Sequence, residues 1–201
     1  MRLAWYTRRV RHEPAFLSFI SKKMVYGLGV SLAAPVFPIF FVRVALLSDT
    51  WIGTLNTVHM AVMLGGYYVW SRLSRSRGSR FVLLATILGL SLYPISLSFL
   101  RQPIPIVILA GLAGFFQAGL DLVLFDELMK RVPLEYAATF VAIAQIFQYF
   151  SAIAAPPLGS LLADHVGVGW AMGASSIVRL TAFGLFAAGV EWGGTRKWKR
   201  T

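Results

Sequence analysis

Apolar stretches of membrane-spanning length recur along this 201-residue chain and are separated by short polar connections. A helix needs about 20 mostly apolar residues to cross the hydrocarbon core of a bilayer. The stretches of sufficient length cover residues 16–47, 51–71, 81–100, 104–130, 136–163 and 168–190. The pattern predicts an all-α membrane protein with six transmembrane helices in one domain, 16–190. A basic cytoplasmic or interfacial segment, 1–15, is expected before it and a basic cytoplasmic tail, 191–201, after it.

Every second connection between these stretches is rich in Lys and Arg. Of the 19 Lys and Arg, 16 lie at the amino terminus, after the second and fourth stretches, and at the carboxy terminus. Because Lys and Arg are enriched on the cytoplasmic side of membrane proteins, both termini are expected in the cytoplasm. We expect the membrane to be a bacterial cytoplasmic (inner) membrane.

The composition agrees with a chain that lies mostly in lipid. It is 57% hydrophobic and 13% charged, whereas soluble domains contain about 25% charged residues. The net charge of +11 lies at helix ends, where it would meet anionic lipid headgroups, so the bilayer is the expected partner and nucleic acid is not. The chain has no Cys, and it contains no nucleophile elbow, phosphate loop or metal-ligand spacing. We therefore expect neither an enzyme nor a bound cofactor or metal.

Prolines fall inside two of the predicted helices. Pro35 and Pro38 are expected to kink the first helix, and Pro156 and Pro157 to kink or break the fifth. Such breaks are tolerated at membrane depth where neighbouring helices or a cavity satisfy the freed backbone groups.

A short internal repeat links the two halves of the chain. Residues 71–78 and 160–167 both read Ser-x-Leu-small-x-x-x-Gly, 89 positions apart. Because each half holds three spans, the repeat predicts two three-helix units of inverted topology, an arrangement used by transporters. The same offset aligns Asn56 with Gln145.

Three passages resemble a known family. Residues 66–80 are similar to its Gly-rich, basic helix-loop motif, 157–164 to its Pro-x-Gly-x-x-Leu-Ala-Asp helix ending, and 34–38 with 49–53 to the first helix of its second half and the start of the next. On these residues the chain resembles the carboxy-terminal six-helix half of a major facilitator superfamily transporter. The resemblance implies half of a major facilitator fold and, as function, secondary transport of a small solute by an assembly of two halves.

Two departures from the family pattern leave other functions open. The basic motif usually carries an Asp where this chain has Arg75, and that Asp normally helps to latch helix movements. Family members also have twelve helices, and one half alone would turn its cavity face toward lipid, where unpaired polar groups are costly. We therefore expect a second copy, forming a homodimer, or another membrane subunit over that face. The alternatives are a non-transporting scaffold subunit of a larger membrane complex, or an inactive remnant.

Polar residues inside the predicted spans are the candidates for a cavity or a coupling site. Asp121 and Arg179 are ionisable groups within spans, and their depths place them in reach of each other. They are expected either to couple transport or to form an ion pair that joins two helices. The other candidates are Gln117, Gln145, Gln148, Asn56 and His59, which could line a polar path, meet a partner chain or form interhelical hydrogen bonds.

A second candidate feature lies at the cytoplasmic side. Asp126 and Glu127 precede Lys130 and Arg131 by four residues each, which favours ion pairs within the helix. The two acids could instead clasp the basic loop and form a cytoplasmic latch in place of the missing Asp, or simply belong to a solvated helix end. The loop arginines concerned are Arg72, Arg75, Arg77 and Arg80.

Overall fold

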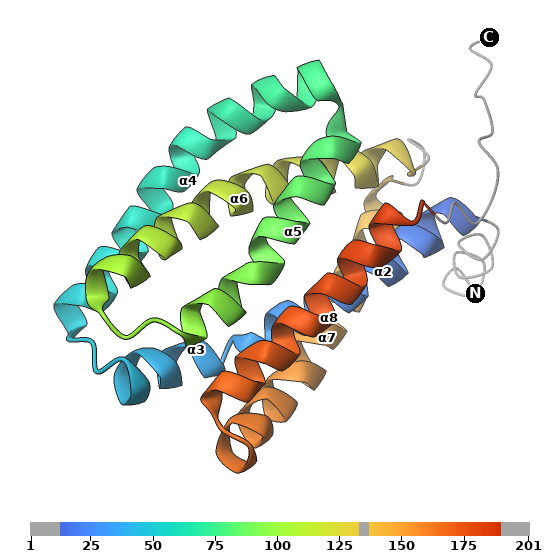
Figure 1. The fold of residues 1–201 in the computed structure, drawn as a ribbon. Coiled ribbons are helices and arrows are strands. Elements are labelled where there is room, and N and C mark those ends of the chain that lie inside the picture. The colour runs from blue at the N-terminus through green and yellow to red at the C-terminus, as the bar shows by residue number, and fades with distance from the viewer. Residues whose placement is uncertain (1–12, 133–136, 190–201) are drawn as a thin grey trace, which may run out of the picture.

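The computed structural model describes residues 13–132 and 137–189, and all the regular structure in them is helical (Figure 1). The elements are α2 (Pro14–Ala33), α3 (Val36–Ile39), the π-helical turn η1 (Phe40–Val44), α4 (Asp49–Arg77), α5 (Ser79–Ser98), α6 (Pro103–Lys130), α7 (Ala137–His165) and α8 (Val168–Ala187). Each of the six predicted stretches therefore coincides with helix. The predicted terminal segments lie outside the described residues, apart from 13–15.

Five of these helical segments are long and apolar enough to cross a membrane, and α4 is not one of them. This differs from the expectation of six helices that are each apolar enough to span a membrane. The reason is that α4 carries Asn56, His59 and several Thr and Gly residues along its 29-residue length. Its length, about 43 Å at 1.5 Å per residue, is nevertheless sufficient for a span.

Proline and glycine set the helix boundaries. Pro14 and Pro103 begin α2 and α6, at positions where a missing N–H removes no helical hydrogen bond. Gly78 separates α4 from α5 with φ 85° and ψ 153°, and Gly167 precedes α8 with φ 105° and ψ 153°. These positive φ values favour glycine. Gly78 and Gly167 are the last residues of the two copies of the eight-residue motif that lie 89 positions apart. The two glycines therefore share a backbone conformation as well as a place in the motif.

The predicted kink in the first helix is present, whereas the fifth predicted helix is not broken. α2 ends at Ala33, and after Pro35 the chain continues as α3, which contains Pro38, and then as η1. Proline supplies no N–H and crowds the preceding turn, which accounts for the interruption. Pro156 and Pro157, by contrast, lie inside the continuous helix α7.

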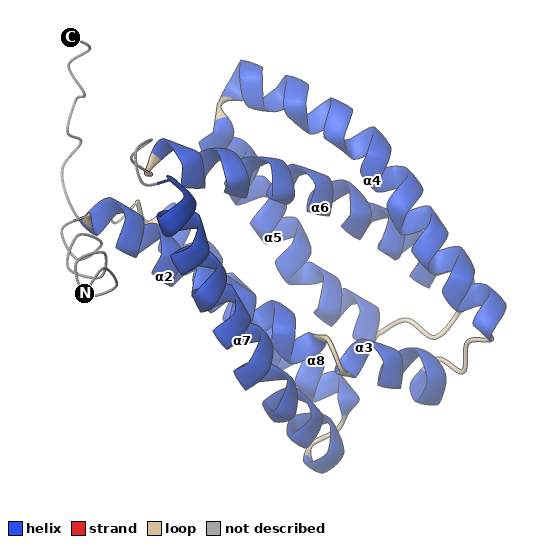
Figure 2. Ribbon diagram, turned by 180° about the vertical axis from the view of Figure 1, so that it is seen from behind, coloured by secondary structure: helices blue, strands red, loops and turns tan. Residues whose placement is uncertain are grey.

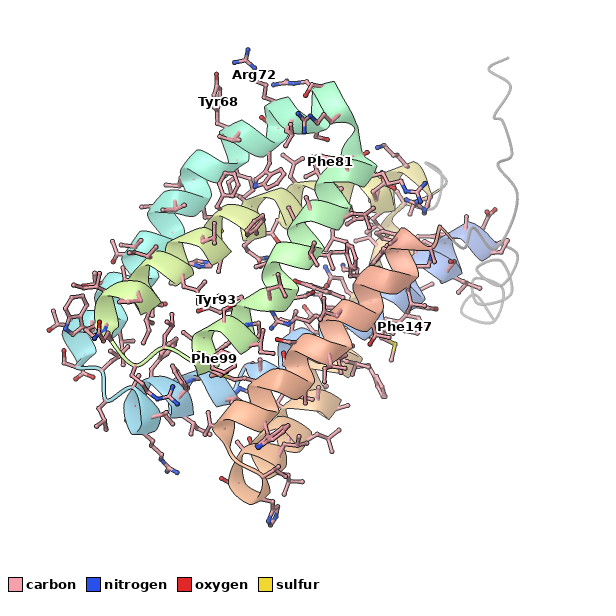
Figure 3. All side chains as sticks on the ribbon, viewed as in Figure 1. Tyr68, Arg72, Phe81, Tyr93, Phe99 and Phe147 are labelled. Atoms are coloured by element: carbon pink, nitrogen blue, oxygen red, sulfur yellow. The ribbon has the colours of Figure 1, made fainter. Side chains whose placement is uncertain are left out.

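The helices pack as two groups joined along one seam (Figures 1 and 2). In one group α6 lies against α4 and α5, and in the other α2 lies against α7 and α8. The seam is formed by α5 and α8, which pack side by side. Large apolar side chains are exposed on the outer faces of both groups (Figure 3), as expected for helices surrounded by lipid.

Glycines allow the closest helix approaches. At Gly114 of α6 and Gly159 of α7, a Cβ atom would collide with the backbone carbonyl oxygens of His59 on α4 and Leu32 on α2, respectively. Small residues at interfaces let membrane helices approach until their backbones touch. The glycines therefore fix how closely α4 and α6, and α2 and α7, are packed.

The first and last helices meet at one end of the bundle (Figure 1). There the Lys22 Nζ lies 5.9 Å from the centroid of the Phe186 ring, and Arg80 Nη2 donates a hydrogen bond to the Ala187 carbonyl oxygen at 3.3 Å. The basic residues 72–80, which were expected in a loop, are helical except for Gly78, and they lie on the end of α4 and the start of α5. Together with the end of α6 they lie at this same end, so the described bundle is strongly basic on one side (Figure 1).

Candidate functional site

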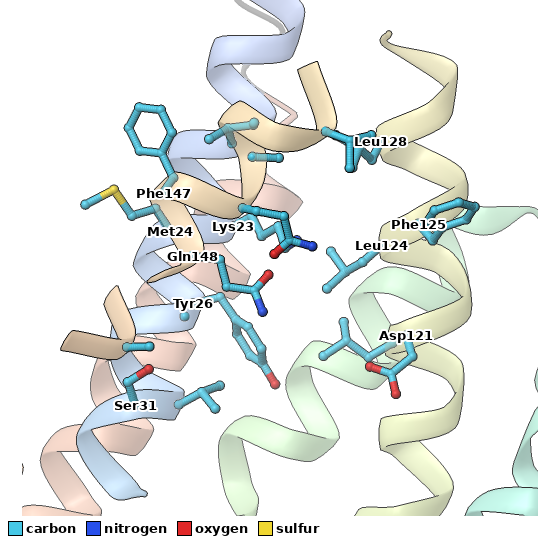
Figure 4. Close-up of a pocket in the computed structure, with 18 of the residues that line it drawn as sticks. Lys23, Met24, Tyr26, Ser31, Asp121, Leu124, Phe125, Leu128, Phe147 and Gln148 are labelled. Carbon is cyan, nitrogen blue, oxygen red and sulfur yellow. The ribbon is translucent and has the colours of Figure 1, made fainter. Parts of the chain in front are cut away.

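A pocket of about 380 Å³ lies between α2, α6 and α7. Apolar side chains form most of its wall, but a polar set interrupts them (Figure 4). The polar lining residues are Lys23, Tyr26 and Ser31 of α2, Gln117 and Asp121 of α6, and Gln145 and Gln148 of α7. Four of the residues predicted from the sequence thus line one pocket: Gln117 and Asp121 from α6, and Gln145 and Gln148 from α7.

Asp121 is the acidic group of this pocket. Its Oδ1 accepts a hydrogen bond from Gln117 Nε2 at 2.7 Å, one helical turn away on the same face. Its Oδ2 accepts a longer one from the Tyr67 hydroxyl of α4 at 3.4 Å. Two donors on two helices therefore orient the carboxylate, which remains exposed on the side away from them.

Across the pocket, α2 supplies the facing wall. Tyr26 from α2 and Gln148 from α7 point toward the α6 wall that carries Asp121 (Figure 4). Lys23 lies one turn before Tyr26 on α2, and the positive charge of Lys23 attracts the negative charge of Asp121. The pocket therefore combines a carboxylate, an ammonium group, a phenol and several amides in an apolar surround.

His59 and Asn56 lie apart from the pocket lining, on α4. His59 Nδ1 is 3.1 Å from the Ala110 carbonyl oxygen of α6, and the His59 backbone is the one that Gly114 approaches. His59 is thus an interhelical contact of the α4–α6 pair. Asn56 is exposed on α4.

The expected pairing of Arg179 with Asp121 is wrong. Arg179 is 4% exposed, and no carboxylate of the described residues lies within ion-pair distance of it. Its Nη1 instead donates a hydrogen bond to the Leu90 carbonyl oxygen of α5 at 3.0 Å.

Pro94 explains this position of Arg179. Within a helix Leu90 would accept from the N–H of residue 94, but proline has none, so its carbonyl is left for another donor. Arg179 takes that place. The neighbouring Ile95 N–H is also diverted, and donates to Ser176 Oγ of α8 at 3.2 Å. α8 thus compensates for the proline in α5, as buried backbone groups require.

The proposed latch between the acids of α6 and the loop arginines is wrong, whereas the ion pairs within the helix are confirmed. Asp126 pairs with Lys130 at 2.6 Å, and Glu127 pairs with both Lys130 and Arg131. These cations lie one turn away on the same helix, so they reach the acids before any loop arginine does. The four arginines on either side of Gly78 have other surroundings. Arg77 lies over the Phe81 ring, Arg80 reaches α8 and Arg75 is exposed. Arg72 is exposed as well (Figure 3).

A link between α6 and the start of α5 does exist at this end. Lys130 Nζ, already paired with two acids, also donates to Ser79 Oγ at 2.6 Å. Arg131 lies over the Phe19 ring of α2, with 4.9 Å between its Cζ and the ring centroid. The end of α6 is therefore connected to α5 and to α2.

Sequence reasoning did not identify Lys23, Tyr26, Ser31 or Tyr67 as site residues. Lys22 and Lys23 both precede a long apolar run, which by sequence alone is typical of side chains that anchor the inner end of a span. The signal that distinguishes Lys23 is its spacing from Tyr26, Gly27 and Val30, all on one helical face and all pocket-lining.

The described residues contain no group of three or more His, Asp or Glu side chains arranged to hold a metal ion. In comparisons with known proteins, the family model described as Major Facilitator Superfamily matches residues 23–192. No curated protein matches the chain. The matched region contains every described pocket-lining residue except Ile20, and all the described helices except the start of α2.

Proposed function

Because the chain belongs to the Major Facilitator Superfamily, a family of membrane transporters, we propose that it forms one half of a secondary transporter for a small solute. The pocket between α2, α6 and α7 would be its contribution to the solute path. The observation that carries this proposal is the collection of Lys23, Asp121 and three glutamines around one pocket in an otherwise apolar bundle. Ionisable residues within membrane spans are costly, and a transport site gives them a reason to be there.

The proposal takes all six long helices as spans, with both chain ends in the cytoplasm. The basic end of the bundle, where α2 begins and α8 ends, supports this orientation through the distribution of Lys and Arg. α4 would be the sixth span. Its polar composition suits a helix that faces a partner or a polar path over part of its length rather than lipid alone.

We also propose that two inverted three-helix repeats build the half. In this arrangement α2 corresponds to α6, α4 to α7 and α5 to α8. The packing supports it, because α2 lies against α7 and α8 as α6 lies against α4 and α5. Gly78 and Gly167, which are 89 residues apart, share one backbone conformation. Alternating access would come from the rocking of one six-helix half against the other.

A second membrane subunit would complete the site. Asp121, Gln145 and Gln148 are exposed in the single chain, and polar groups that face hydrocarbon without partners are strongly unfavourable. We propose that a second copy of the chain, or another six-helix half, covers this face and encloses the pocket. The mass of the complex after gentle extraction from membranes tests this. A single chain without a membrane partner would refute the two-half assembly.

Transport itself is tested in vesicles that contain the extracted complex and a trapped pH-sensitive dye. We expect solute-dependent uptake that varies with pH, and we expect Asp121→Asn to abolish the pH dependence while the complex still assembles. Asp164→Asn is the matched control, since Asp164 is an exposed carboxylate of α7 that does not line the pocket. Equal behaviour of the two variants would refute a coupling role of Asp121, and loss of assembly would make Asp121 structural.

A further inference from the structure

Arg179 carries a positive charge that the described residues do not neutralise. Its side chain is almost fully buried, and only Nη1 has a hydrogen-bond partner, the Leu90 carbonyl oxygen. The buried Arg179 Nε has no hydrogen-bond partner among the described residues. A buried charge without a counter-ion is strongly unfavourable in a low-dielectric interior. A neutral donor would have served the Leu90 carbonyl equally well, so the charge itself needs another explanation.

The Arg179 side chain lies where α8 packs against both α2 and α5. The Arg179 Cγ packs against Gly29 of α2, where an added Cβ would lie 2.8 Å away, and Nη1 reaches Leu90 on α5. Tyr26 lies one turn before Gly29 on the same face of α2. Tyr26 also lines the pocket, whereas Arg179 does not. Arg179 therefore acts on the pocket from behind its α2 wall.

The pocket as a whole is more suited to an anion than to a cation. Lys23 lines it and Arg179 contacts Gly29, one turn after Tyr26 on α2, whereas Asp121 is the single acid among the described lining residues. Asp121 already accepts hydrogen bonds from Gln117 and Tyr67. No hydrogen bond of the described residues involves the Tyr26 hydroxyl group, which Figure 4 shows directed into the space between α2 and α6. A hydroxyl donor between two cationic side chains matches a carboxylate.

We infer that this pocket recognises a small carboxylate-bearing solute, whose carboxylate accepts hydrogen bonds from Tyr26 and Lys23 and is stabilised by the charge of Arg179. The inference rests on the proposed transport function and names the chemical class of its solute. Arg179 is a positioning residue in this account, because it acts through the field at Tyr26 rather than by contact with the solute.

The test measures binding of three probes of similar size and different charge to the extracted complex: ¹³C-labelled acetate, acetamide and ethylammonium. Saturation-transfer NMR reports binding of each without requiring transport. We expect acetate to bind and the other two not to compete with it. Tyr26→Phe should weaken acetate binding about tenfold or more, since it removes a hydrogen bond to a charged group.

Arg179 requires a variant that keeps the fold. In Pro94→Ala the restored N–H of residue 94 would donate to the Leu90 carbonyl, so the helix no longer needs Arg179 there. We expect Pro94→Ala alone to bind acetate normally and Pro94→Ala with Arg179→Gln to fold but to bind acetate at least about tenfold more weakly. If Arg179 only compensates for the proline, the double variant will bind acetate like the unaltered protein, and the inference is overturned.

Two further results would also overturn it. Acetamide or ethylammonium binding as well as acetate would show that charge does not select the solute. Failure of acetate to bind would contradict recognition through the carboxylate. Vesicle uptake separates failure of this inference from failure of the proposed function. Uptake of a neutral or cationic solute would support the transport function and reject recognition of a carboxylate. Acetate binding without uptake of any carboxylate would support the carboxylate site and reject the transport function.

Discussion

The contact between α4 and α6 at Gly114 is the packing feature whose disruption is best defined. The Cβ of an alanine at this position would fall within 3.0 Å of the His59 carbonyl oxygen, closer than real Cβ atoms approach. The obstacle is backbone, so rotation of a side chain does not relieve it. In Gly114→Ala the two helices must therefore separate along their interface.

The size of the effect follows from three contributions. Insertion of a methyl group into a packed interface costs about 1–3 kcal/mol. Separation of the helices also lengthens the 3.1 Å contact between His59 Nδ1 and the Ala110 carbonyl oxygen, which contributes about 1 kcal/mol. Alanine in place of glycine favours the helix by about 0.5–1 kcal/mol. We expect a net loss of about 1–3 kcal/mol in the free energy of unfolding.

Unfolding of the purified protein in mixed micelles, followed by helical circular dichroism as denaturing detergent increases, measures this loss. Gly65→Ala is the control, because Gly65 lies on α4 and a Cβ there meets nothing within 4 Å. That variant should be as stable as the parent or slightly more stable. Equal stability of the two alanine variants would refute the argument that Gly114 sets the distance between the helices.

Other contacts give predictions in the same unfolding assay. Trp70→Phe removes the hydrogen bond from Nε1 to the Phe115 carbonyl oxygen, 2.7 Å long in a buried site, and should cost about 1 kcal/mol; no change relative to the exposed Trp170→Phe would contradict this. Ser175→Ala removes the buried hydrogen bond from Ser175 Oγ to the Gly29 carbonyl oxygen, which still accepts a bond within α2, so a loss of about 1 kcal/mol is expected, and a loss no larger than that of an exposed serine would argue against it. Lys130→Met should lower stability by less than about 1 kcal/mol, with the loss shrinking at high salt, because its ion pairs are half exposed; a salt-independent loss would point to packing instead.

The positions of the helices were predictable because apolar length and helix punctuation are local properties. The run from 104 to 130 is helical from Pro103 to Lys130, and the first helix is interrupted at Pro35, as its prolines predicted. The pairs Asp126–Lys130 and Glu127–Arg131 were equally predictable, since a spacing of four residues brings them together in any helix. α4 shows the limit of this reasoning, because length predicted a span and polar composition makes it unlike the others.

The candidate site was predictable only in part. Gln117 and Asp121 share a face through their spacing, and the structure brings Gln145 and Gln148 opposite them. Which α2 residues complete the pocket depends on the rotation of α2 about its axis, which its all-round apolar sequence does not define. For this reason the sequence identified neither Lys23 nor Tyr26 as a pocket residue.

By itself, the sequence determined the membrane class, the helix limits and the family, since these depend on runs, punctuation and motifs within single segments. Only the tertiary structure decided the partners of Arg179. Depth along the helices suggested Asp121, but a proline on a third helix left the Leu90 carbonyl open, and Arg179 donates to it. The physical reason is that the depth of a residue within its span can be counted along the chain. Which side chain or carbonyl of another helix that residue contacts depends on how all the helices pack together.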